Sequence, residues 1–198
     1  IAFEEECEQL LETGNITMML LGIDGLKHIN GLYDRGFGDE VIRIVSQRIQ
    51  SLLPPDAQMF RLDGDEFGIL IRGAERGIAR SLFYAIHETF SIQQAYENKR
   101  FSCSLSCGCV IATQDGKEYL GLLKRASYAL EFAKHNGKDR IEFFAPELLG
   151  HRERRLKLTE LLRESVEQRF KGFSLHFQPI FDAKRKLVGA EALCRWNC

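Results

Sequence analysis

The chain has 198 residues with a formal net charge of −1, and 44% of its residues are hydrophobic. This length suits one complete domain with a further segment, or one large domain, and the hydrophobic fraction argues against an intrinsically disordered chain. The near-zero charge argues against a nucleic-acid-binding protein and against a surface that contacts an anionic membrane.

Hydrophobic periodicity predicts alternating helices and short strands over the first 145 residues. In chain order the predicted elements are a helix at 3–11, a strand at 16–23, a helix at 26–32, a helix at 39–52, strands at 59–62 and 67–71, a helix at 74–90, a strand at 101–112, a helix at 119–136 and a strand at 140–144. Gly38-Asp39 is expected to cap the start of the third helix, and Pro54 stops it. This order predicts an α+β fold, with a ferredoxin-like sheet flanked by helices.

The chain is expected to comprise three segments. Residues 1–145 form the α+β domain, and residues 146–170 form a charged linker helix with leucines at helical spacing. Residues 171–198 are the truncated start of another domain, in which strand-like runs at 173–181 and 187–196 flank a polar turn.

Six cysteines are too few for a dense disulfide framework. Cys103, Cys107 and Cys109 have odd numbers within one apolar run, so their side chains are expected on one face of a strand. Such a trio could hold a metal ion, but no histidine lies at ligand spacing, and core packing is favoured. Free thiols, with no signal peptide or membrane-spanning run, predict a cytoplasmic chain, or the cytoplasmic part of a membrane-anchored or sensor-linked parent.

Acidic residues are expected at one edge of the sheet. Asp65 and Glu66 lie at the tip of the predicted hairpin, and Asp24 directly follows the buried strand. Carboxylates on neighbouring strands form Mg²⁺ sites for phosphoryl chemistry, although an acidic hairpin tip is also a common solvated turn. Lys134 and Lys138, one helical turn apart, are placed to meet triphosphate oxygens or, alternatively, to be solvated at a helix end.

Several runs occur in the order typical of one family. The chain resembles the GGDEF family of diguanylate cyclases in the runs 23–30, 38–41, 61–67, 106–108, 126–134 and 137–138. The resemblance spans roughly residues 1–145. It implies the palm-type sheet of diguanylate and adenylyl cyclases, a Mg²⁺ cofactor, and condensation of two GTP molecules into cyclic di-GMP between the subunits of a homodimer.

The resemblance also implies roles for individual residues. The implied roles are guanine recognition by Asn30 and Asp39, binding of the terminal phosphates by the backbone of Gly25 and Leu26 with Lys134 and Lys138, metal ligation by Asp65, and catalysis by Asp65 and Glu66. The guanine assignment is chemically sensible, because a carboxylate accepts hydrogen bonds from guanine N–H groups and an amide can complete the set.

The sequence departs from the family pattern at four places. The first-strand metal ligand is replaced by Gly22, whose side chain cannot coordinate Mg²⁺, so the metal is expected to bind weakly or not at all. Asp24 is a candidate substitute on the same face, one pleat further and about 7 Å away. Asp63 replaces the first glycine of the signature, and Lys138 replaces an arginine. Residues 54–57 replace the Arg-x-x-Asp product-inhibition motif, so feedback binding of cyclic di-GMP is not expected.

The last segment resembles the start of an EAL phosphodiesterase domain. The runs 177–180 and 189–196 carry this second resemblance. It implies that Glu191 is a metal ligand and that Gln178 and Arg195 lie along the cyclic di-GMP site. Without the remainder of the domain, the two apolar strands are expected to be poorly ordered or paired with another chain.

Three functions are compatible with these residues. The favoured one is a degenerate GGDEF domain that binds GTP and regulates a downstream EAL phosphodiesterase. The alternatives are an active diguanylate cyclase and a non-catalytic dimerisation or spacer module. The loss of the acid at Gly22 favours the first, because a cyclase with that change is expected to be weak or inactive.

Overall fold

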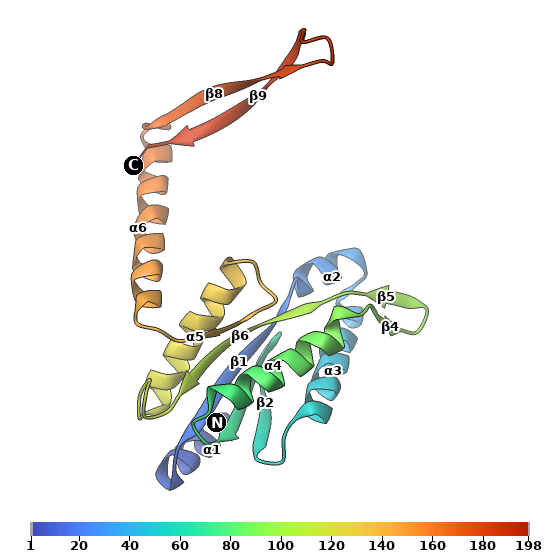
Figure 1. Cartoon of the computed structure of the whole chain (residues 1–198), viewed down its shortest axis with the longest axis vertical. Coiled ribbons are helices and arrows are strands. Elements are labelled where there is room, and N and C mark those ends of the chain that lie inside the picture. The colour runs from blue at the N-terminus through green and yellow to red at the C-terminus, as the bar shows by residue number, and fades with distance from the viewer. Residues whose placement is uncertain (1, 198) are drawn as a thin grey trace. The chain divides into compact units, whose positions relative to one another are not determined.

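A computed structural model describes residues 2–197, and the chain divides into two units after Leu148. The first unit is built on a five-stranded sheet in the order β2-β3-β1-β6-β7 (Figure 1). Its strands are β1 (Ile16–Asp24), β2 (Ala57–Asp63), β3 (Glu66–Arg72), β6 (Ser104–Ile111) and β7 (Ile141–Phe143). All neighbouring strands are antiparallel except β6 and β7, so the predicted α+β fold is confirmed.

Helices cover both faces of this sheet. They are α1 (Ala2–Thr13), α2 (Leu26–Leu32), α3 (Arg35–Leu52), α4 (Arg76–Ser91) and α5 (Tyr119–His135). All nine residues of β1 are buried, as expected for a central strand. Its odd-numbered side chains from Met19 to Ile23 pack with α3 and α4, whereas Met18 and Leu20 pack with α1 and α5. Positions 22 and 24, which alternate with these, therefore face the α5 layer.

The backbone of α5 lies directly on the sheet at Gly108. A Cβ atom at this position would collide with the carbonyl oxygen of Ala126 and would lie 2.9 Å from the Cα of Leu130. The close approach of the two backbones therefore requires glycine at this position, and it lets the middle of α5 pack directly on β6.

Two predicted boundaries are wrong. The helix α3 begins at Arg35 rather than at Gly38-Asp39, because the side chain of Asp34 caps it by accepting the N–H of Phe37 at 2.7 Å. The predicted strand 101–112 is divided, because Phe101 ends the small hairpin of β4 (Gln94–Tyr96) and β5 (Lys99–Phe101), while β6 begins at Ser104.

The three cysteines near β6 are confirmed as core residues on one side of the sheet. Cys103, Cys107 and Cys109 are buried and belong to the cluster formed with α3 and α4. Burial raises the pKa of the Cys103 thiol to about 12, and it raises the pKa of Cys107 and Cys109 as well. These thiols are therefore protonated, inert packing groups.

The second unit contains all but the first two residues of α6 (Glu147–Glu167) and an antiparallel hairpin of β8 (Phe173–Phe181) and β9 (Leu187–Trp196). The strands pair with each other along their length, in contrast to the expected poor order. The Asp182 carboxylate fixes the turn by accepting the N–H groups of Lys184 and Lys186. Trp196 joins hairpin to helix by donating to the Ser165 hydroxyl at 3.0 Å. Among the helices of residues 2–197, none has the length and apolarity needed to cross a membrane.

Candidate functional site

The signature hairpin is held against the central strand. Gly64, with a φ of +47°, occupies the tight turn between β2 and β3, where a positive φ favours glycine. The backbone N–H of Ile23 donates to the carbonyl of Asp65 at 3.1 Å, and Gly22 lies directly opposite Glu66 in the register of β1 and β3. The Asp65 carboxylate is partly exposed and has no side-chain partner within residues 2–197. The strand pairing therefore brings the end of β1 and both hairpin acids to one sheet edge.

A lysine from α5 reaches this edge and pairs with one of the acids. The Nζ of Lys134 lies 2.8 Å from Oε1 of Glu66, and the two side chains are 27% and 39% exposed. A Cβ atom at Gly22 would collide with this Nζ and would lie 2.5 Å from Cε of the same lysine. Lys134 thus fills the space that a larger side chain at position 22 would take.

Asp24 is enclosed by hydrogen-bond donors on the same face of the sheet. The residue is 9% exposed, and its carboxylate accepts hydrogen bonds from the hydroxyls of Ser104 and Ser106, each at 2.9 Å. The backbone N–H of Asp139 also donates to it at 3.2 Å. Both carboxylate oxygens are used, and they tie the loop after α5 to the strands β1 and β6. Sequence reasoning missed this cluster, although serines at alternate positions opposite an acid were its signal.

The predicted phosphate segment lies at the start of α2. Gly25 has a φ of +76° and is exposed, and its carbonyl accepts the N–H groups of His28 and Ile29. Leu26 is the first residue of the helix, and the first N–H groups of any helix have no intrahelical acceptor. This turn requires glycine and leaves backbone donors at the end of β1, next to the acidic edge.

The two predicted guanine-reading residues come from neighbouring helices. Asn30 lies on α2, and its buried Oδ1 has no partner within residues 2–197. Its amide packs over Gly38 of α3, where a Cβ atom would lie 2.8 Å from Cγ of Asn30. Asp39 follows on α3, and its carboxylate is exposed with no partner in the described part of the chain. Adjoining helices therefore supply an unpartnered amide oxygen, buried against Gly38, and a free carboxylate.

The predicted cationic pair is divided in this structure. Lys134 is engaged with Glu66, whereas Lys138 lies in the exposed loop after Gly137, with a φ of +61°. The Lys138 backbone N–H donates to the carbonyl of Ala133 at 3.0 Å, which closes the helix end. Only the second of the two ammonium groups is free of a partner within residues 2–197.

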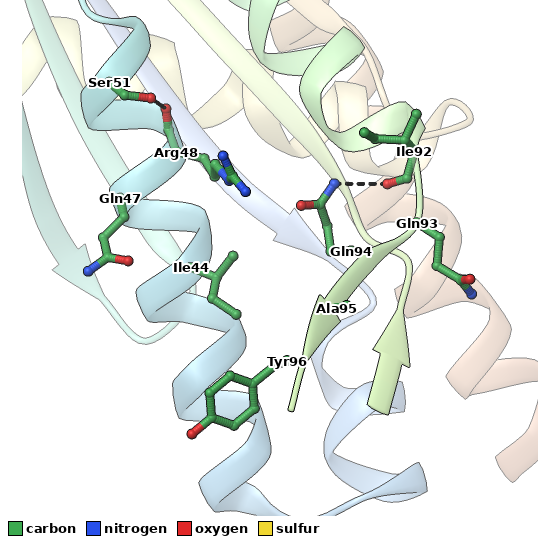
Figure 2. Close-up of a pocket in the computed structure, with 9 residues that line it drawn as sticks. All are labelled: Ile44, Gln47, Arg48, Ser51, Ile92, Gln93, Gln94, Ala95 and Tyr96. Atoms are coloured by element: carbon green, nitrogen blue, oxygen red, sulfur yellow. Dashed lines mark hydrogen bonds between the residues drawn. The ribbon is translucent and has the colours of Figure 1, made fainter. Parts of the chain in front are cut away.

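A groove of about 600 Å³ lies elsewhere in the first unit, between α3 and β4 (Figure 2). Its wall includes Ile44 and Arg48 from α3 and Tyr96 from β4, and it contains none of the predicted site residues. Figure 2 shows Gln94 donating to the carbonyl of Ile92, at 2.9 Å, which fixes the loop after α4. The groove therefore belongs to the scaffold rather than to the acidic edge.

The family profile described as "Diguanylate cyclase, GGDEF domain" matches residues 2–140, which is more than half of the chain. The chain belongs to the GGDEF family. It is a domain of the kind found in cyclic di-GMP signalling proteins. Its sheet flanked by helices agrees with this family's known structures.

Individual relatives of this GGDEF domain are longer proteins. It is 31% identical over 202 residues to "Cyclic di-GMP phosphodiesterase NbdA" of Pseudomonas aeruginosa, covering 99% of this chain and 26% of that protein. It is 30% identical over 188 residues to "Signaling protein YkoW" of Bacillus subtilis, covering 91% and 23%. The chain thus spans about a quarter of these relatives. A solved EAL/GGDEF domain protein from M. capsulatus is 25% identical with a TM-score of 0.64, covering 73% of this chain and 97% of that one.

Proposed function

We propose that this GGDEF domain binds GTP in a regulatory role toward a downstream EAL phosphodiesterase, and that it is degenerate as a cyclase. The observation that carries the proposal is the contrast between the two ends of the site. On the guanine side, Asn30 has an unpartnered oxygen buried against Gly38, and Asp39 has a free carboxylate. On the metal side, position 22 has no carboxylate, and Lys134 fills its place.

The phosphate side supports nucleotide binding as well. The positive φ of Gly25 leaves the first backbone N–H groups of α2 without intrahelical acceptors at the end of β1, and such groups are donors that phosphate oxygens accept. Lys138 is exposed, and it follows the end of α5, which carries Lys134. A purine nucleotide with a charged phosphate chain suits a site with hydrogen-bonding groups at one end and cationic groups at the other.

The hairpin supports the EAL assignment. Gln178 and Glu191 lie directly opposite each other in the register of β8 and β9. Arg195 lies four residues beyond Glu191 on the same strand, so all three side chains belong to one face of the hairpin. Residues that resemble the metal ligand and the cyclic di-GMP contacts of an EAL domain are therefore gathered on one face, which the remainder of that domain would complete in the parent protein.

Calorimetric titration of the 198-residue chain with GTP tests nucleotide binding. Loss of charge-assisted hydrogen bonds from guanine to Asp39 is expected to weaken binding by about 10- to 100-fold in Asp39→Ala. Asp56→Ala is the matched control, because Asp56 is also exposed but lies outside the site. ATP should bind no better to the wild type than GTP does to Asp39→Ala. Equal GTP affinity in all three proteins would contradict the proposal and favour a spacer module.

Incubation with GTP and Mg²⁺, followed by chromatography of the nucleotides, tests whether the domain is degenerate as a cyclase. We expect GTP to remain unchanged, because the acid at position 22 is missing. Appearance of cyclic di-GMP would favour the active cyclase instead. The reaction is run over a range of chain concentrations, so that weak dimerisation does not conceal activity.

A further inference from the structure

We propose that the Lys134 ammonium replaces the metal ion in this site, so that the domain takes the triphosphate of GTP without Mg²⁺. The part that concerns GTP rests on the proposed function. The part that concerns the metal rests on the geometry of the apo protein alone. GGDEF domains are generally Mg²⁺-dependent, so this assignment separates the chain from the behaviour of its family.

The Lys134 ammonium group lies over the central strand at Gly22. Strand pairing puts Gly22 opposite Glu66, and position 22 faces the layer of α5. Lys134 lies in the last turn of α5, with Nζ 2.8 Å from Glu66 Oε1. The collision that a Cβ at Gly22 would make with Nζ shows that the ammonium occupies the space over the strand itself. A cation thus already neutralises the hairpin acid from the side where the missing carboxylate would stand.

The carboxylate oxygens at this edge of the sheet do not fit Mg²⁺. This ion requires an octahedral set of oxygen ligands at about 2.0–2.1 Å. Glu66 is bound to the ammonium, and both oxygens of Asp24 accept hydrogen bonds from serine hydroxyls and a backbone N–H. Among the neighbouring acids, the hairpin residues Asp63 and Asp65 have no side-chain partner within residues 2–197. No group of three or more metal-ligating side chains occurs in the described part of the chain.

The Lys134 ammonium offers positive charge and hydrogen-bond donors to a ligand. A lysine carries one positive charge and three donors at a fixed place, and phosphate oxygens accept such donors. One donor of Lys134 is directed to Glu66, and the others remain for a ligand. Because this cation is covalently attached, its contribution does not depend on the concentration of a divalent ion. The species bound is therefore the nucleoside triphosphate itself rather than its magnesium complex.

The metal half of the proposal is tested with Mn²⁺ alone, without nucleotide, by electron paramagnetic resonance on the full chain. The wild type is expected to leave Mn²⁺ free up to millimolar concentration. Lys134→Met keeps the length of the side chain but removes its charge, so Asp65 and Glu66 become uncompensated, and at least a tenfold gain in Mn²⁺ affinity is expected, an increase of about 1.4 kcal/mol. Lys117→Met is the matched control, because Lys117 is exposed in the loop before α5 and lies outside the site, and it should behave as the wild type. Tight Mn²⁺ binding by the wild type, or no gain in the folded Lys134→Met protein, would overturn the proposal.

The nucleotide half needs no variant. Titration of the wild type with GTP in EDTA and in excess Mg²⁺ should give an affinity in EDTA at least equal to that in Mg²⁺. An affinity that falls tenfold or more when Mg²⁺ is removed would overturn the metal-free assignment. Absence of GTP binding under both conditions would instead refute the proposed function, while the Mn²⁺ measurement would still decide the role of Lys134. Should Lys134→Met fail to fold by circular dichroism, Lys134→Gln serves the same comparison.

Discussion

Replacing Asp24 with alanine is expected to destabilise the first unit strongly. The change leaves three donors without their acceptor, namely the hydroxyls of Ser104 and Ser106 and the N–H of Asp139. Ser106 is wholly buried, so water cannot replace its lost bond. A hydrogen bond to a charged group contributes about 1.5–3 kcal/mol, and bonds that share one acceptor are not additive. We therefore expect the free energy of unfolding to fall by about 3–5 kcal/mol.

Urea unfolding followed by circular dichroism measures this loss. The only tryptophan, Trp196, lies in the second unit, so its fluorescence would report the hairpin rather than the sheet. Asp39→Ala is the control, because that carboxylate is exposed and unpartnered in the described residues, and its loss should cost less than about 0.5 kcal/mol. A cost below about 1 kcal/mol for Asp24→Ala would refute the structural role of Asp24 and restore it as a candidate metal ligand.

Three other outcomes are expected. Gly108→Ala should destabilise the first unit by about 1–3 kcal/mol in the same urea assay, because its Cβ would meet the backbone of α5; an unchanged midpoint would contradict the close contact. In a Cys198→Ser background, a thiol reagent should label Cys194 quickly and the four buried thiols only after unfolding, as peptide mapping would show. Burial raises the pKa of Cys7 to about 11 and of Cys103 to about 12, above the ordinary value of 9.0. The unfolded thiols therefore ionise first, and stability should fall as the pH rises from about 9 to 12, more in the wild type than in Cys103→Ala.

Much of the fold could be predicted from the sequence because its signals are local. The apolar run at 16–23, which forms nearly all of β1, and the helix at Leu26–Leu32 follow directly from hydrophobic periodicity. The start of α3 at Arg35 precedes the cap predicted at Gly38-Asp39. Asp34 caps the helix because its side chain accepts the N–H of Phe37, whereas Gly38 is buried under the amide of Asn30. That contact joins two helices, so it could not be predicted from local spacing.

The acidic edge shows the same division between local and distant signals. The sequence indicates which residues carry charge, but not which charges meet. Lys134 and Glu66 are 68 residues apart, and their ion pair depends on the register of β1 with β3 and on the seating of α5 at Gly108. The enclosure of Asp24 by the serines of β6 likewise depends on tertiary pairing. The type of each residue was therefore predictable, whereas its partner was not.

The reverse substitution Gly22→Asp is expected to make two changes at once. It supplies the missing carboxylate, and its Cβ cannot coexist with Lys134 in its present position, so the lysine is displaced from Glu66. Gly22→Ala displaces the lysine without supplying an acid and separates the two effects. With GTP and Mg²⁺, chromatography should detect cyclic di-GMP from Gly22→Asp but not from Gly22→Ala. If Gly22→Asp binds GTP yet forms no product, the lost acid is not the main defect. The departures at Asp63 and Lys138, one adding negative charge at the turn and the other losing a bidentate donor, would then limit the chemistry.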